Sequence, residues 1–96
     1  MGDIIIDDDH IKKDVINTII NYKYNLRQSK SDDIMGLSHK IFVCDELLRL
    51  VGSSEQPPLR VIEDFGYRMK RYANIFPDIY DDCVLACNVI VDILTD

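Results

Sequence analysis

Apolar residues recur every three or four positions over most of the chain, the spacing that gathers side chains on one side of an α-helix. The first such stripe predicts a helix over residues 10–28. Its members are Ile11, Val15, Ile19, Tyr22 and Leu26. Asp9 is expected to cap this helix, because its carboxylate can accept hydrogen bonds from the free backbone N–H groups of the first turn.

The second stripe is the longest in the chain and predicts a helix over residues 32–51. It consists of Ile34, Leu37, Ile41, Cys44, Leu48 and Val51. Ser31 is the expected N-cap, and Asp32 and Asp33 would then fall in the first turn, where the helix dipole favours negative charge. Gly52 is expected to end the helix, because glycine readily adopts the left-handed conformation that is common at helix C-termini.

Prolines mark the starts of two further helices. Pro58 fits the entrance of a helix over residues 58–75, and Pro77 fits the entrance of one over residues 78–94. The inward positions of the former are Leu59, Ile62, Phe65, Met69, Tyr72 and Ala73. Gly66 lies in its middle, at a cost of about 1 kcal/mol relative to alanine, and we expect it to let a neighbouring helix approach closely.

Four helices joined by short connections favour antiparallel neighbours, so the predicted fold is an all-α, single-domain antiparallel four-helix bundle over residues 1–96. Residues 1–8, which are acidic and apolar, are expected to form a flexible N-terminal segment. The alternative for residues 84–94, rich in valine and isoleucine, is a β-strand. It lacks a second strand-like segment of similar strength with which to pair.

The last predicted helix carries apolar residues in nearly all directions around its axis. They include Ile79, Tyr80, Cys83, Val84, Leu85, Ala86, Cys87, Val89, Ile90, Val91, Ile93 and Leu94. A helix that is apolar all round must be covered all round, whereas a domain of this size leaves much of its surface in water. Either this helix is the central element of the fold, or a second molecule covers its outer side.

The chain is acidic, with 11 lysines and arginines against 17 aspartates and glutamates and a formal net charge of −6. This charge repels nucleic acid unless the basic residues gather on one face. The N-terminus lacks the basic and apolar regions of an export signal, and the longest apolar run, Cys83 to Val91, is too short to cross a membrane. An odd number of cysteines in apolar helical sequence indicates reduced thiols, so we expect a cytoplasmic protein.

Candidate catalytic and metal-binding residues are few. Cys44, Cys83 and Cys87, with His39 or His10, could in principle ligate a metal, but the close Cys-x-x-Cys spacing of structural zinc sites is absent and buried cysteine usually acts as a small apolar residue. The aspartates at helix starts are explained by the helix dipole. No phosphate-binding glycine loop or nucleophile motif is present in the sequence. We therefore expect that the protein is not an enzyme and that it binds no cofactor and no metal.

Two other side-chain groups suggest chemistry of a different kind. His39, followed by Lys40, could serve a histidine phosphotransfer module, in which an exposed imidazole nitrogen attacks an aspartyl phosphate. Arg68 and Arg71, one turn apart with Tyr67 beside them, could hold a phosphate or carboxylate, or contact nucleic acid. The competing expectation is that these arginines pair with the acidic start of the last helix.

The pattern as a whole favours a non-catalytic, acidic protein-binding module, such as an adaptor, a regulatory subunit or an immunity-type inhibitor that neutralises a basic partner. The first candidate interface is the apolar outer side of the last helix, with Val84, Leu85, Val89 and Ile93 as anchors, and a homodimer could form there. The second is acidic and uses Asp32, Asp33, Asp45 and Glu46. Apolar anchors usually carry most of the binding energy, so the first is favoured.

Overall fold

The computed structural model describes residues 8–96 and contains four α-helices within them. They are α1 (Asp8–Gln28), α2 (Ile34–Ser53), α3 (Pro58–Ala73) and α4 (Pro77–Thr95). The predicted four-helix bundle is confirmed, and each helix begins and ends within about two residues of its expected bounds. Residues 84–94 are helical, so the strand alternative is wrong. The expectation for the N-terminal segment lies outside the described residues, except that Asp8 already belongs to α1.

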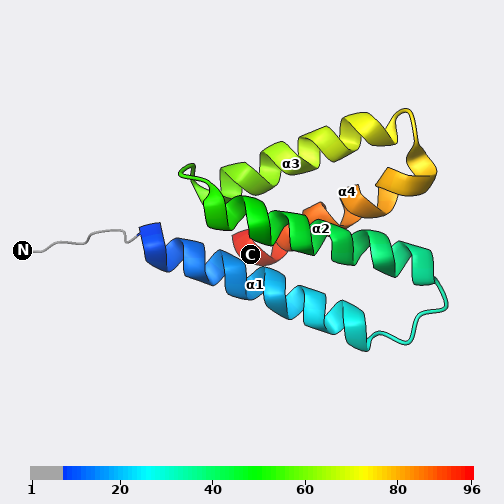
Figure 1. Cartoon of the computed structure of the whole chain (residues 1–96), viewed down its shortest axis with the longest axis horizontal. Coiled ribbons are helices and arrows are strands. Elements are labelled where there is room, and N and C mark those ends of the chain that lie inside the picture. Colours follow the sequence, from blue (N-terminus) through cyan, green and yellow to red (C-terminus); the bar gives the residue numbers. More distant parts are fainter. Residues whose placement is uncertain (1–7) are drawn as a thin grey trace, which may run out of the picture.

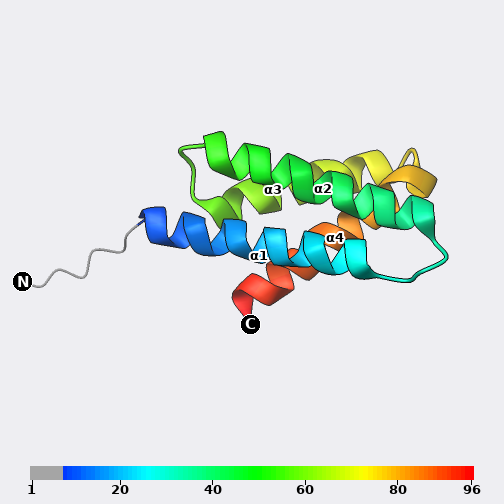
Figure 2. The same cartoon turned by 60° about the horizontal axis from the view of Figure 1, so that its bottom comes forward.

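The helices run alternately in opposite directions, as Figures 1 and 2 show. α1 packs mainly against α2, and α3 packs mainly against α4. α4 also crosses against α2 and reaches α1, so it contacts each of the other three helices. Within residues 8–96, no helix combines the length and the hydrophobicity that crossing a bilayer requires.

One hydrophobic cluster joins the four helices. Its fully buried members include Ile19 of α1, Leu47 of α2, Ile62 of α3 and Ile90 of α4, one from each helix. Ile19 and Ile62 belong to the predicted stripes, whereas Leu47 lies beside the stripe predicted for α2. Burying each of the four side chains stabilises the fold by about 1.5–3 kcal/mol relative to leaving it exposed.

The core follows the predicted stripes only in part: on α2 it is built from Val43, Cys44, Leu47 and Val51, while Ile34 of the predicted stripe is exposed. The inward positions expected for Ile11 of α1 and Tyr72 of α3 are also wrong, because both side chains are exposed.

The close approach expected at Gly66 is present. A Cβ atom added to Gly66 of α3 would lie 3.3 Å from the Cβ of Cys87 on α4, closer than ordinary van der Waals contact. Glycine at this position thus lets the two helices pack directly, at the expense of helix propensity.

Three expected capping residues are corrected. Asp9 lies inside α1, which begins one residue earlier, and so is not its N-cap. The N-cap of α2 is Asp33 rather than Ser31, because Asp33 Oδ1 accepts a hydrogen bond from the Gly36 N–H at 2.9 Å. Gly52 continues α2 instead of ending it, and the C-cap is Ser54, whose N–H donates to the Leu50 carbonyl.

Candidate functional site

The outer side of α4 is only partly available as an interface. Leu85 and Ile93 are 48% and 50% exposed, whereas Val84 and Val89 are half-buried. Val84 packs against the core and lines a groove of about 610 Å³ between α3 and α4, together with Gly66 and other residues of both helices. Two of the four expected anchors therefore face solvent, and α4 keeps some of the apolar surplus that its sequence indicated.

A second group of exposed apolar side chains lies at one end of the bundle. Both views place the start of α2 beside the turn between α3 and α4, at the end opposite the α2–α3 loop (Figures 1 and 2). Five large apolar side chains of these segments are between 46% and 73% exposed. They are Ile34, Met35, Ile75, Phe76 and Ile79, and we call this surface the apolar end.

Sequence reasoning missed the apolar end because most of these residues fit a helix pattern. Ile34 continues the core stripe of α2, yet it lies in the first turn of that helix and is 73% exposed. Ile75 and Phe76 occupy the short turn between two helices, where polar residues are usual. The two adjacent apolar residues next to Pro77 were the feature of the sequence that could have indicated this surface.

The four acidic residues of the second candidate interface lie in two places, at the N-terminal end of α2 and three turns further along it. Asp33 is occupied as the N-cap of α2. Asp45, three turns further along, pairs with Lys23 of α1, and Glu46 pairs with Arg49 of its own helix at 2.9 Å. The hydrogen bond from Arg49 lowers the pKa of the Glu46 carboxyl. Three of the four carboxylates are therefore engaged within the chain itself.

The basic face of α3 is not neutralised by α4. Among residues 10–96, no carboxylate forms an ion pair with Arg68, Lys70 or Arg71, so the expected pairing with the acidic start of α4 is wrong. Arg68 and Arg71 line one surface pocket of about 240 Å³, as their spacing indicated. Tyr67, which is 72% exposed, lines a neighbouring pocket that it shares with Arg71.

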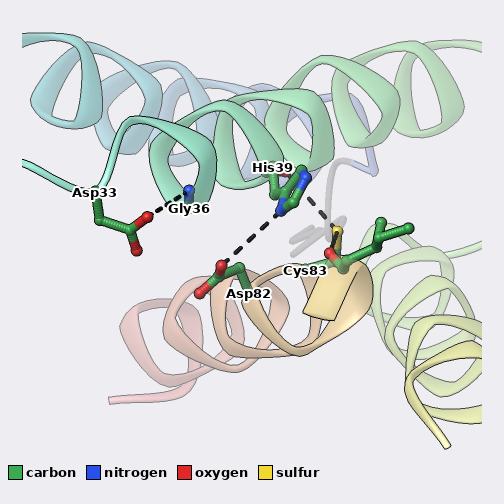
Figure 3. A network of polar contacts seen from close by, with 6 residues as sticks. Asp33, Gly36, His39, Asp82 and Cys83 are labelled. Atoms are coloured by element: carbon green, nitrogen blue, oxygen red, sulfur yellow. Dashed lines mark hydrogen bonds and ion pairs between the residues drawn. The ribbon is translucent and has the colours of Figure 1, made fainter. Parts of the chain in front are cut away.

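His39 of α2 faces the start of α4 (Figure 3). Its Nδ1 atom is buried, has no hydrogen-bond partner within the described part of the chain and lies 3.9 Å from Oδ2 of Asp82. The side chain is only 21% exposed, and the Cys83 thiol points to the His39 carbonyl at 3.9 Å. A phosphotransfer histidine needs an exposed nitrogen, and Nδ1 does not meet that requirement.

The three cysteines are buried and free. Burial, followed by the charge of Asp45, raises the pKa of Cys44 to about 11. Burial, followed by the neighbouring thiols Cys83 and Cys44, raises the pKa of Cys87 to about 12. Thiols that hold their protons this strongly are poor nucleophiles at neutral pH.

Within residues 10–96, no three histidine, cysteine or acidic side chains are grouped so that they could hold a metal ion. His39 and the cysteines thus contribute to the contact between α2 and α4 but do not form the tetrahedral site considered from the sequence.

Comparison of the chain with protein-family models, with curated proteins and with solved structures gave no match.

Proposed function

We propose that this protein is a non-catalytic protein-binding module that docks on its partner through the apolar end. The observation that supports this proposal is the exposure of five large apolar side chains on three segments at one end of the bundle. Contiguous apolar surface that its own chain leaves in water is typical of a binding site. Aromatic and branched side chains at the centre of such a surface usually supply most of the binding energy.

The apolar end is a better anchor than the outer side of α4. Ile34, Met35 and Ile75 are each about 70% exposed, against about half for Leu85 and Ile93. More of these three side chains can therefore be removed from water on binding, and the hydrophobic gain is roughly proportional to the area removed. Phe76 adds a ring that is 56% exposed, while Ile79, at 46%, is exposed to about the same extent as Leu85.

The charge of the chain fits the same proposal. A net charge of −6 would speed the approach of a basic partner by long-range attraction, in the manner of an adaptor, a regulatory subunit or an immunity-type inhibitor. The buried free thiols suit a reducing compartment such as the cytoplasm.

Paired variants test which surface binds. The protein is used as bait in an extract of its source cells, the captured partner is purified, and its affinity is measured by calorimetry. Replacing Met35 and Phe76 together with serine should weaken binding at least tenfold, because two exposed anchors are removed. Phe76 occupies the N-cap position of α4, where serine is favourable, so the helix should be retained.

The matched control replaces Leu85 and Ile93 of α4 with serine and should change the affinity by less than twofold. Loss of binding in this control with none in the first variant would assign the interface to α4 instead. Sedimentation of the protein alone tests whether the partner is a second copy. A monomer that captures nothing would refute the proposed function.

A further inference from the structure

The surface pocket at the C-terminal end of α3 combines two cations with two apolar walls. Arg68, Arg71, Tyr72 and Ile75 line it. Ile75 also belongs to the apolar end, so the pocket and that surface are continuous. A ligand that covers the apolar end would therefore reach the two guanidinium groups.

Neighbouring aromatic rings hold two of the pocket residues in place. The guanidinium carbon of Arg68 lies 5.7 Å from the centroid of the Phe65 ring, within the range of a cation–π contact. The ring of Tyr72 packs against Tyr80 of α4, with the two centroids 5.2 Å apart. Side chains that are already positioned lose less entropy when a ligand binds.

The charge of this region is opposite to that of the whole chain. Arg68, Lys70 and Arg71 lie within four residues of one another on α3. Asp64, one turn before Arg68, lines a pocket with it but does not form an ion pair within the described residues. The Debye length is about 10 Å at 0.1 M salt, so a docked group responds to these nearby cations rather than to the net charge of −6.

The ordinary explanation of basic residues here is incomplete. Lys70 and Arg71 lie in the last turn of α3, where cations offset the negative end of the helix dipole. That explanation does not account for Arg68, nor for the exposed Tyr72 and Ile75 in the same pocket. A carboxylate flanked by an apolar side chain uses every one of these groups.

We propose that the pocket of Arg68, Arg71, Tyr72 and Ile75 binds a carboxylate side chain of an acidic, apolar peptide segment of the partner protein. This inference rests on the proposed function and adds the chemistry of the partner segment. Guanidinium groups bind carboxylates in planar, charge-assisted geometry, and Ile75 and Tyr72 accept the apolar neighbour of that carboxylate. A partner that is basic overall can carry such a segment locally.

Selection from a library of random 16-residue peptides displayed on phage tests the inference even while the partner is unidentified. Enriched sequences should combine aspartate or glutamate with leucine, isoleucine or phenylalanine. Synthetic copies should bind at least tenfold more weakly when their acidic residues are replaced by the corresponding amides. Their binding should also weaken several-fold between 50 and 500 mM salt, because the contact is ionic.

Two protein variants with the same change in net charge locate the contact. Replacing Arg68 and Arg71 with glutamine should weaken peptide binding about tenfold. Replacing Arg27 and Arg60, which are exposed on α1 and on the first turn of α3, should leave it unchanged. Circular dichroism and urea unfolding confirm that both variants fold.

Several results would overturn the inference, and they differ in what they leave standing. The selected peptides could lack acidic residues and yet lose binding when Met35 and Phe76 are replaced. That result would support the proposed function and rule out the carboxylate site. Tighter, arginine-dependent binding to vesicles containing phosphatidylserine, or to an RNA oligonucleotide, would replace the peptide by another polyanion. A selection that enriches nothing would count against both proposals.

Discussion

At the scale of single residues, burial decides what the reactive side chains can do. His39 and the three cysteines are among the groups that the sequence offers for nucleophilic chemistry or metal binding. The packing of α2 against α4 encloses His39 Nδ1 and removes the thiols from water. Their residue types could be read from the sequence, but their accessibility depends on how two distant helices cross.

The buried thiols should make the protein sensitive to alkali. Cys44 and Cys87 have pKa values raised to about 11 and about 12, and the pKa of Tyr22 is raised as well, mainly by burial. Well below pH 9 each thiol is protonated in both states, so its contribution to stability is constant. As the pH rises from about 9, the unfolded thiols ionise first, and the free energy of unfolding falls until the folded thiols ionise too.

Urea unfolding at several pH values measures this effect. Each buried thiol contributes a slope of up to about 1.4 kcal/mol per pH unit in that range. Cys87→Ala should therefore reduce the slope with which the free energy of unfolding falls between about pH 9 and 11. This holds even if the variant is less stable than the wild type at neutral pH. A decline as steep as that of the wild type would show that Cys87 is not the group responsible.

His39 should resist phosphorylation. Its Nδ1 atom is enclosed, and the Asp82 carboxylate 3.9 Å away repels an incoming phosphoryl group. Incubation with acetyl phosphate should leave less than one-tenth of the protein phosphorylated by intact-mass measurement, with exposed His10 as an internal reference. Acid-labile phosphate that is abolished by His39→Gln would instead support the phosphotransfer hypothesis, with Nε2 as the attacking atom.

At the scale of helices, the sequence predicted the elements well and their caps poorly. Spacing of apolar residues depends on a period repeated over several turns, so an error at one position does not change the result. A cap depends on a single backbone conformation: Ser31, Asp32 and Asp33 are all chemically suitable, and only Asp33 reaches the Gly36 N–H. The site was harder still, because the apolar end joins segments about 40 residues apart in sequence.

Gly52 in the last turn of α2 and Gly66 in the middle of α3 should respond differently to alanine. A Cβ atom added at Gly52 of α2 would have no neighbour within 4 Å, so Gly52→Ala should stabilise the protein through helix propensity. The gain should not exceed about 0.5–1 kcal/mol, the value for an interior position, because Gly52 lies in the last turn. At Gly66 the same gain is opposed by contact with the Cys87 Cβ at 3.3 Å. Gly66→Ala should therefore be neutral or destabilising in urea unfolding, and an equal gain at both positions would contradict the close approach of α3 and α4.

The cap of α2 supplies a second matched pair. Asp33→Ala removes the acceptor of the Gly36 N–H and should cost about 1 kcal/mol of stability. Asp32→Ala, one residue earlier, removes similar negative charge without that hydrogen bond and should change stability by less than about 0.5 kcal/mol. Equal losses in thermal unfolding would mean that charge near the helix dipole, rather than the hydrogen bond, stabilises this end.

At the scale of the whole molecule, the four helices share one core and should unfold together. Ile19, Leu47, Ile62 and Ile90 belong to one cluster, so no helix has a separate core of its own among the described residues. Helical signal at 222 nm and tyrosine fluorescence should therefore give coincident urea transitions, as for other small two-state domains. Separate midpoints would indicate that α1 detaches before α3 and α4.

The contacts of α4 with every other helix also bear on biosynthesis. Ribosomes deliver α1, α2 and α3 before α4, so a nascent chain of three helices still lacks the helix that packs against α3 and α2 in the folded protein. Such a chain exposes apolar surface of the kind that chaperones bind. Maturation of this protein is thus expected to await translation of its fourth helix.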